Sequence, residues 1–490
     1  MPTLPRIRPA DPSAGCRILG EKVHPRKIFA QSSLFRDIAG AAWFTRGLMT
    51  QPLEPTPQTG AAGIEARRAA LDILERIAKG ASLDDALNNC RTFDLLEGPD
   101  RGFARALATC VLRRRGSLDH VLGAYIDRPL PKKAIRVMDI LRLASAQTLF
   151  MGTPDHAAVS TAVSLAGERR ETLGYAKLVN AVGRKVAKNG PAVVKKLPAR
   201  VDTPGWLWRS WERAYGAQTA RAIAEAHRNE PRLDITLKAP GAADEWTDRL
   251  EAELLPTGSL RRDGVSDVTQ LPGFEEGAWW VQDAAASLPA RLAGDVSGKS
   301  VFDLCAAPGG KTLQFAAMGA NVTAVDISEP RLERLVDNLA RTNLTAKLVT
   351  EDILRWRPED KADIVLLDAP CSATGTIRRH PDIPWTKSDT DIAALTSLQA
   401  RMLDHAIGFV KPGGMLIYCV CSLQPEEGEK QAEAALARHK HLARKPVLPE
   451  EIAGLAGGVN RYGDLRTTPA MLAEAGAMDG FFAARFIVNE

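Results

Sequence analysis

The spacing of hydrophobic residues divides the chain into a helical part and a part in which strands and helices alternate. Between residues 61 and 190, apolar side chains recur every three or four positions, as in Leu71, Leu74 and Ile77, which is the period of an amphipathic helix. Gly and Pro residues interrupt this pattern near residues 98, 130 and 153. The pattern therefore predicts an all-helical (all-α) N-terminal domain.

From residue 284 to residue 490, short apolar runs alternate with segments of helical period. The predicted strands end near residues 303, 326, 352, 367, 419 and 487, and the predicted helices cover residues 329–341, 391–410 and 426–438. Such alternation is typical of a parallel sheet with helices on both faces. We expect an α/β, Rossmann-like core with a seven-stranded, mostly parallel sheet. The three acids that open the last helix are expected to complement its dipole.

Between these two parts, the sequence predicts a linker and a small subdomain. Residues 191–202 are rich in Lys, Arg and Pro, and residues 203–283 combine one helical stretch with two short strands, which indicates an α+β subdomain. The helical stretch carries Trp206, Trp208, Trp211 and Tyr215. Aromatic residues beside arginines can stack on bases, but we favour the interpretation that they anchor the helix to a neighbour.

The net charge of +5 is concentrated at the N-terminus. Residues 1–48 contain eight basic and three acidic side chains, so the remainder of the chain sums to about zero. A positive electrostatic potential that attracts RNA must therefore come from a local patch of basic residues. The run Arg113, Arg114 and Arg115 is either such a patch or an ordinary solvent-exposed face. We interpret residues 1–60 as a basic leader, either a disordered arm or an extension upstream of Met49; a targeting peptide and an RNA-binding arm are the alternatives.

Cysteine usage and hydropathy indicate the cellular compartment in which the protein works. The seven cysteines are odd in number and scattered, which favours a reducing compartment over a disulfide framework, and we expect a cytoplasmic monomer. The chain contains no apolar run near the roughly 20 residues that a membrane span requires. Cys419 and Cys421 form a Cys-x-Cys pair, but without two further ligands the pair does not indicate zinc, so no metal is predicted.

A glycine-rich turn after the first strand of the α/β part is the strongest signal for a cofactor. The strand ends at Asp303, and a Pro-Gly-Gly turn precedes a helical pattern. Its spacing fits neither the dinucleotide fingerprint nor the phosphate-binding loop, which suggests a nucleotide-like cofactor other than NAD or ATP. Asp326, Asp352 and Asp368 close later strands, and acids in these places line the crevice where ligands bind to such sheets.

Several motifs resemble those of the NOL1/NOP2/Sun-type RNA 5-methylcytosine methyltransferases. They are Cys-Ala-Ala-Pro-Gly-Gly-Lys at 305–311, Asp-Ala-Pro-Cys-Ser-Ala-Thr-Gly at 368–375, Arg-Arg-His-Pro-Asp at 378–382, Cys-Ser-Leu-Gln-Pro-Glu-Glu at 421–427 and Asp-Gly-Phe-Phe at 479–482. The resemblance covers about residues 203–487. The helical domain is similar in pattern and position to NusB-type RNA-binding domains, and together the two modules imply a small-subunit (16S) rRNA methyltransferase.

The resemblance implies S-adenosylmethionine as the cofactor and assigns the site residues. Those expected around the cofactor are Cys305, Ala306, Ala307, Pro308, Gly309, Gly310, Lys311, Asp326, Asp352 and Asp368. Cytosine C5 is too weak a nucleophile to accept a methyl group until a thiolate adds to C6. Cys421 is implied to be that nucleophile, Cys371 to help eliminate the enzyme by assisting removal of the C5 proton, and Asp368 to contact the N3/N4 edge of the base. Arg378 and Arg379 are expected to hold RNA phosphates.

One departure from the family pattern concerns the residues beside the nucleophile. The preceding position is commonly Thr in the family, but here it is Val420, with a second thiol at Cys419. Cys419 is therefore an alternative nucleophile. Two other functions stay open: methylation of cytosine in tRNA, and a non-catalytic RNA-binding or assembly role.

Overall fold

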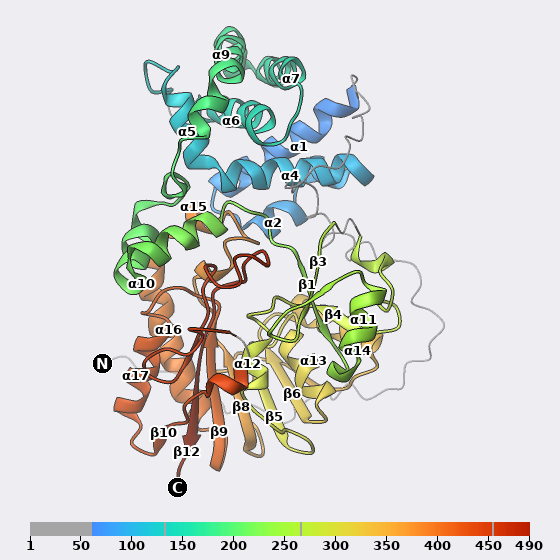
Figure 1. Ribbon diagram of the computed structural model, residues 1–490, viewed down its shortest axis with the longest axis vertical. Coiled ribbons are helices and arrows are strands. Elements are labelled where there is room, and N and C mark those ends of the chain that lie inside the picture. Colours follow the sequence, from blue (N-terminus) through green and yellow to red (C-terminus); the bar gives the residue numbers. More distant parts are fainter. Residues whose placement is uncertain (1–60, 132–133, 265–266, 453–454) are drawn as a thin grey trace, which may run out of the picture.

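The computed structural model describes residues 61–131, 134–264, 267–452 and 455–490 (Figure 1). The leader predicted over residues 1–60 lies outside the described residues. In the part of the chain that is described, no helix is both long and apolar enough to cross a membrane.

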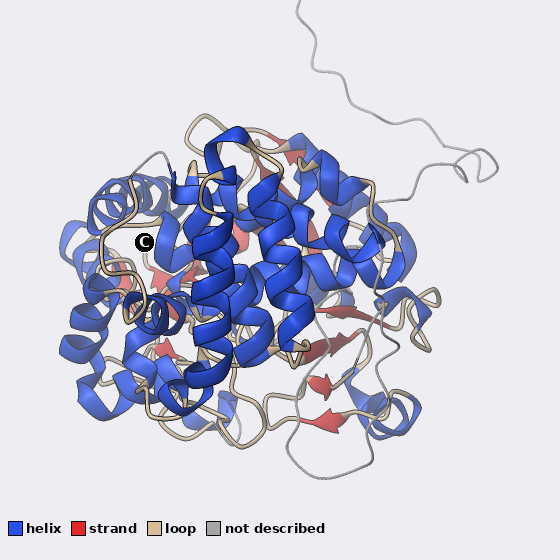
Figure 2. Ribbon diagram, turned by 90° about the horizontal axis from the view of Figure 1, so that it is seen from above, coloured by secondary structure: helices blue, strands red, loops and turns tan. Residues whose placement is uncertain are grey.

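The N-terminal domain is all-helical, as predicted. Its helices are α1 (Ala61–Ala78), α2 (Leu83–Asn88), α3 (Arg91–Asp94), α4 (Gly98–Arg113), α5 (Arg115–Gly123), α6 (Ile135–Phe150), α7 (Asp155–Gly167), α8 (Arg170–Leu173) and α9 (Ala176–Val194). Leu71, Leu107 and Ile140 lie in one apolar core with less than 1 % of their surface exposed. Seen from above, these helices lie in front of the strands of the C-terminal part (Figure 2).

The subdomain consists of a long helix and a small sheet. Helix α10 (Gly205–Ala226) bends at Gly216, and the sheet has the antiparallel order β2-β3-β1-β4. The remaining elements are β1 (Leu233–Leu237), α11 (Ala243–Arg249), β2 (Glu253–Leu254), β3 (Leu260–Arg262) and β4 (Trp279–Val281). Trp208 and Trp211 are buried against Ile377 and Leu423. The prediction that the aromatics anchor this helix is therefore confirmed for these two residues.

The C-terminal part is an α/β unit around a mixed sheet. The strand order is β10-β12-β9-β8-β5-β6-β7, and β11 pairs with β12. The five strands from β9 to β7 are parallel, whereas β12 runs antiparallel to β9 and to β10. The strands are β5 (Ser300–Leu304), β6 (Asn321–Asp326), β7 (Lys347–Thr350), β8 (Ala362–Asp368), β9 (Val410–Val420), β10 (Leu442–Arg444), β11 (Leu465–Arg466) and β12 (Phe482–Val488). The short strand β11 adds one strand to the seven predicted.

Helices cover both faces of this sheet because its strands are apolar on both sides. Helices α12 (Leu288–Arg291), α13 (Gly310–Ala317) and α14 (Glu329–Thr342) lie on one face, and α16 (Asp389–Ile407) and α17 (Glu429–Arg438) lie on the other. Helix α16 ends three residues earlier than predicted, and residues 411–414, expected to end it, belong to β9 instead. Helix α17 starts three residues later than predicted, which leaves Glu427 outside it.

The helical domain rests on the loop around α15 (Ile383–Thr386). The Trp385 indole N–H donates to the Leu112 carbonyl at 2.9 Å, and the Leu83 N–H donates to Asp382 at 3.1 Å. Arg113 donates to the Arg378 carbonyl at 2.7 Å. Arg114 and Arg115 are also half-buried in this junction. The basic run is therefore neither a solvated face nor an RNA-contact patch, because it connects two domains.

Candidate active site

The glycine-rich turn connects β5 to the start of α13 with little free space. Gly309 has φ +108°, and a Cβ placed on it would lie 2.2 Å from the Leu335 Cδ1 atom. A side chain at this position would be strained by both the backbone angle and the contact. Glycine therefore keeps the turn close to α14 and leaves its backbone accessible to a ligand.

The strand-end acids are arranged around this turn. Asp326 accepts the N–H groups of Ala307 at 3.1 Å and Ser328 at 2.9 Å. Lys311 is buried and donates to Asp368 at 2.7 Å. Burial opposes the charge on Lys311, but Asp368, Cys419 and Asp303 together outweigh burial and raise the Lys311 pKa. These contacts join the turn to β6 and β8.

Two of the predicted cofactor residues stand apart from that set. Asp352 accepts the Leu354 N–H at 3.0 Å, which closes its own turn. Cys305 has φ +61°, and burial raises the pKa of its thiol. Both follow the carboxyl ends of parallel strands, Asp352 after β7 and Cys305 after β5. Both residues therefore border the crevice, but neither is hydrogen-bonded to Asp326 or Asp368.

The donor set fits S-adenosylmethionine. Asp303 is completely buried, and its Oδ1 atom has no hydrogen-bond partner among the described residues, while Oδ2 accepts the Thr312 hydroxyl at 2.6 Å. Burial raises the pKa of Asp303 to about 7. Ile327, just after β6, is an apolar side chain that is 70 % exposed. Carboxylates for hydroxyl and cationic groups, together with an exposed apolar side chain, suit a ligand that contains a sulfonium, a ribose and an aromatic base.

The two predicted catalytic thiols lie side by side. The Sγ atoms of Cys371 and Cys421 are 3.4 Å apart, although the residues come from loops after different strands, β8 and β9. The hydrogen bond with Cys421 and burial together raise the pKa of Cys371 well above its ordinary value. The thiolate form of Cys371 is thus disfavoured in this position.

Cys419 has different surroundings from the thiol pair. It is completely buried in β9, and its Sγ lies 3.6 Å from the Asp368 Oδ1 atom. Burial and the nearby Asp368 carboxylate raise the pKa of the Cys419 thiol. A buried thiol that faces an acid is a poor nucleophile because its thiolate is disfavoured.

A buried carboxylate connects the two cysteine loops. Glu427 accepts the Ser372 N–H at 2.8 Å and the Ser372 hydroxyl at 2.5 Å. It also accepts the Ser422 hydroxyl at 2.5 Å and the Gln399 amide at 3.0 Å. Ser372 and Ser422 each follow one of the two cysteines. The expectation that the acids at 426–429 act together on the helix dipole is therefore wrong for Glu427, which is buried under the thiols.

Arg378 and Arg379 form ion pairs inside the protein, which corrects the expectation that they hold RNA phosphates. Arg378 is buried and donates to Asp479 at 3.2 Å, while Arg379 donates to Asp479 at 3.0 Å and to Asp283 at 2.6 Å. These two guanidinium groups outweigh burial and lower the pKa of Asp283 to about 2. Their charges are thus compensated without a ligand.

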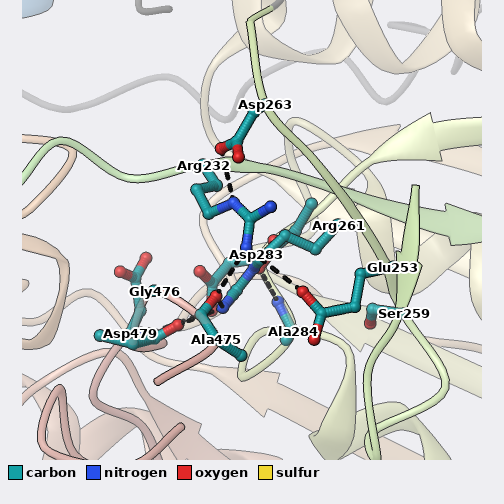
Figure 3. A network of polar contacts seen from close by, with 12 residues as sticks. Arg232, Glu253, Ser259, Arg261, Asp263, Asp283, Ala284, Ala475, Gly476 and Asp479 are labelled. Atoms are coloured by element: carbon teal, nitrogen blue, oxygen red, sulfur yellow. Dashed lines mark hydrogen bonds and ion pairs between the residues drawn. The ribbon is translucent and has the colours of Figure 1, made fainter. Parts of the chain in front are cut away.

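The same network continues into the subdomain. Figure 3 shows Arg261 and Arg232 beside Asp283 and the loop at Ala475, whose carbonyl accepts from Arg261 at 2.8 Å and from Arg232 at 3.2 Å. Arg261 also pairs with Asp234 at 2.6 Å, with both side chains buried. The network therefore holds the small sheet, the loop after Cys371 and the C-terminal loop in one arrangement.

The structure brings together the thiol pair, and it joins Asp368, Lys311, the glycine turn and Asp326 into a second group. The sequence analysis missed the positions of Glu427, Asp283 and Asp479. Glu427 and Asp479 lie in the motifs at 421–427 and 479–482, so their places in these motifs could have identified them as site residues. Asp283 is the last residue of the predicted α+β subdomain at 203–283, and nothing in the sequence indicated its two arginine partners.

Two segments of the chain match known protein families. Residues 293–487 match the family described as 16S rRNA methyltransferase RsmB/F, and residues 64–188 match the NusB family. Ribosomal RNA small subunit methyltransferase B of Shewanella oneidensis is 34% identical over 385 residues, which cover 76% of this chain and 89% of that protein. The protein of the same name from Salmonella arizonae is 33% identical over 437 residues, covering 86% and 97%.

Solved structures support the fold. The crystal structure of PH0851 covers 88% of this chain and 99% of its own, with a TM-score of 0.66 and 23% identity. NSun6 from Pyrococcus horikoshii, solved with SFG, covers 59% of this chain and 98% of its own, with a TM-score of 0.50 and 19% identity.

Proposed function

The chain belongs to the family of ribosomal RNA small subunit methyltransferase B, and from that premise we propose that it methylates C5 of a cytosine in 16S rRNA through a covalent adduct. The coarser activity, S-adenosylmethionine-dependent RNA methylation, follows from the family. The target atom, the adduct and the residue roles are the proposal. The observation that carries it is the 3.4 Å approach of two thiols beside the cofactor crevice.

The chemistry begins with the Cys421 thiolate. Its sulfur bonds to C6 of the cytosine, and the electron pair of the C5–C6 double bond makes C5 nucleophilic. C5 then accepts a methyl group, which bound S-adenosylmethionine would supply as its S–CH3 bond breaks and S-adenosylhomocysteine leaves. Removal of the C5 proton restores the double bond and expels Cys421 as thiolate. Every bond formed by the enzyme is thus broken again, and the RNA keeps one methyl group in place of one proton.

The surroundings of each thiol support these roles. The hydrogen bond with Cys421 and burial raise the pKa of Cys371 well above its ordinary value, which disfavours Cys371 as the attacking thiolate. Cys371 assists removal of the C5 proton before elimination, from a position 3.4 Å from the nucleophile. Asp368 faces the same crevice and contacts the N3/N4 edge of the base, and Lys311 fixes its orientation at 2.7 Å.

Two other functions remain distinguishable by experiment. A tRNA cytosine-C5 methyltransferase would use the same residues, and the NusB-family helical domain favours rRNA. A non-catalytic assembly factor would not need two adjacent thiols, since a scaffold gains nothing from their reactivity.

Methyl transfer from labelled S-adenosylmethionine to unmodified small-subunit rRNA and to tRNA tests the proposal. Cys421→Ala should abolish transfer, and Cys371→Ala should accumulate a protein–RNA adduct that survives a denaturing gel. Cys419→Ala is the matched control and should still transfer methyl. Transfer by Cys421→Ala would refute the assigned nucleophile, and labelling of tRNA alone would refute the substrate. Absence of transfer to either RNA would favour the assembly role.

A further inference from the structure

Helix α9 and the linker after it carry an uninterrupted excess of positive charge. Residues 176–200 contain seven basic side chains and no acidic one: Lys177, Arg184, Lys185, Lys188, Lys195, Lys196 and Arg200. All seven are exposed. The charge of residues 49–490 sums to about zero, so this segment is a local concentration of charge in an otherwise balanced chain.

The basic residues of α9 lie on the side of the helix that faces solvent. Lys177, Arg184 and Lys188 are seven and four residues apart, which places them on one stripe of the helix. Val182 and Val186 lie on the opposite side, buried against the other helices of the domain. At a rise of about 1.5 Å per residue, the stripe extends roughly 16 Å along the helix.

Among the residues that the structure describes, these charges have no acidic partners. None of the seven forms an ion pair with a carboxylate in the part of the chain that the structure describes. Arg184 donates only to the Asn180 side chain, at 3.2 Å, and Arg200 lies over the Trp208 ring at 5.0 Å. By contrast, Arg136 and Arg142 of the same domain are paired with nearby acids. An unpaired stripe of like charge favours a polyanionic ligand.

The stripe continues from the helical domain toward the catalytic part. The linker passes from the end of α9 to α10 along the side of the molecule (Figure 1). Lys195, Lys196 and Arg200 lie on it. A ligand that follows these charges would therefore contact both domains. A hollow of about 590 Å³ at the end of the linker is lined by acidic as well as basic side chains, so it does not extend the stripe.

We propose that the exposed face of α9 and the linker at residues 195–200, here called the α9 surface, binds RNA phosphates outside the catalytic crevice. The inference rests on the proposed function, since it takes the substrate RNA as the polyanion. It assigns RNA binding to a surface other than the arginines at 113–115 and 378–379, which are occupied by internal contacts. The α9 surface contributes affinity for long RNA and takes no part in methyl transfer.

A triple variant tests this assignment, with Lys177→Gln, Arg184→Gln and Lys188→Gln combined. Gln preserves helix propensity and a polar, unbranched side chain while removing three charges. Binding of transcribed small-subunit rRNA is measured by filter retention between about 0.05 and 0.3 M salt. Each lost phosphate contact removes about 0.7 to 0.9 from the slope of log K against log salt, so the slope should fall by about 2 to 3. Affinity near 0.1 M salt should fall at least about tenfold.

A second triple variant is the matched control: Arg76→Gln, Lys79→Gln and Arg91→Gln. It removes the same charge from exposed positions of the same domain. The control should keep wild-type affinity and slope. The α9 variant should raise KM for the rRNA and leave kcat unchanged, and its thermal unfolding should match the wild type.

The possible results separate the inference from the proposed function. Unchanged affinity and slope in the α9 variant would assign the surface to a partner other than RNA and overturn the inference. An equal loss in the control would show a dependence on total charge and would also overturn it. If the wild type binds rRNA with the expected salt slope but transfers no methyl group, the proposed function fails, and a weakened α9 variant still supports the inference.

Discussion

Glu427 provides a sharp test of how the two catalytic loops are held, through the substitution Glu427→Gln. The carboxylate accepts four hydrogen bonds from Ser372, Ser422 and Gln399. Gln has nearly the same shape but is neutral, and it replaces one acceptor oxygen by a donor that faces other donors. The substitution thus changes the hydrogen bonding of both loops without creating a cavity.

The expected loss of stability can be worked out from those four bonds. A hydrogen bond to a charged group contributes about 1.5–3 kcal/mol, and one between neutral groups about 0.5–1.5 kcal/mol. Four bonds weakened by about 1 kcal/mol each give roughly 4 kcal/mol, and removing a buried charge recovers part of this. We expect the free energy of unfolding to fall by about 2–3 kcal/mol.

The activity should fall for a geometric reason. Ser372 and Ser422 follow the two cysteines directly, so a shift of either loop changes the 3.4 Å separation of the thiols. A displacement of about 1 Å at a reacting group can reduce a rate about a hundredfold. We expect kcat to fall by about 10- to 100-fold, with a smaller change in KM for the RNA.

Three measurements check this prediction: urea unfolding, single-turnover methyl transfer, and the pH dependence of alkylation of the two thiols. The matched control is Glu426→Gln, one residue away, whose exposed carboxylate pairs with Lys430 and should contribute little. Wild-type unfolding and turnover in Glu427→Gln would refute the reasoning. A loss of stability with unchanged turnover and thiol alkylation would restrict Glu427 to a structural role.

Three further substitutions probe the cofactor turn, the buried ion pairs and a buried histidine. Gly309→Ala brings a Cβ against Leu335 at a positive φ, so S-adenosylmethionine affinity measured by calorimetry should fall at least about tenfold, and an unchanged affinity would contradict the described turn. Arg379→Gln leaves Asp283 buried without its nearest partner and should lower the free energy of unfolding in urea by about 3–5 kcal/mol; a loss that disappears at high salt would instead indicate a surface pair. Burial, together with nearby arginines, lowers the pKa of His227 from 6.5 to about 3. The unfolded chain therefore takes up this proton first as the pH falls, so the stability contributed by the neutral histidine is complete above about pH 6.5 and declines as the pH falls toward 3. His227→Phe should remove about 2 kcal/mol of the stability lost between pH 7.5 and 5, measured as the difference in urea unfolding from the wild type, and identical pH profiles would rule out this contribution.

The class of fold and the position of the cofactor turn were predictable from the amino-acid sequence, because both depend on local patterns. Helical and strand periods are set by neighbouring residues, and they correctly predicted the all-helical domain and the alternating core. The glycine turn and the acids at 303, 326 and 368 follow directly from strands that the periodicity identifies. The ends of α16 and β9 were less well predicted, since residues 411–414 resemble a helix stop but belong to the sheet.

Only the tertiary structure decided which charged residues face solvent and which form internal contacts. Arg113 bonds to a carbonyl 265 residues away, and Arg378 pairs with Asp479 across 101 residues. No local pattern distinguishes such arginines from the exposed basic residues of α9, which have the same chemistry. The approach of Cys371 to Cys421 and the burial of Glu427 beneath them likewise depend on how β8, β9 and their loops pack. Burial and pairing arise from contacts between distant segments, so they were fixed only when those segments came together in the fold.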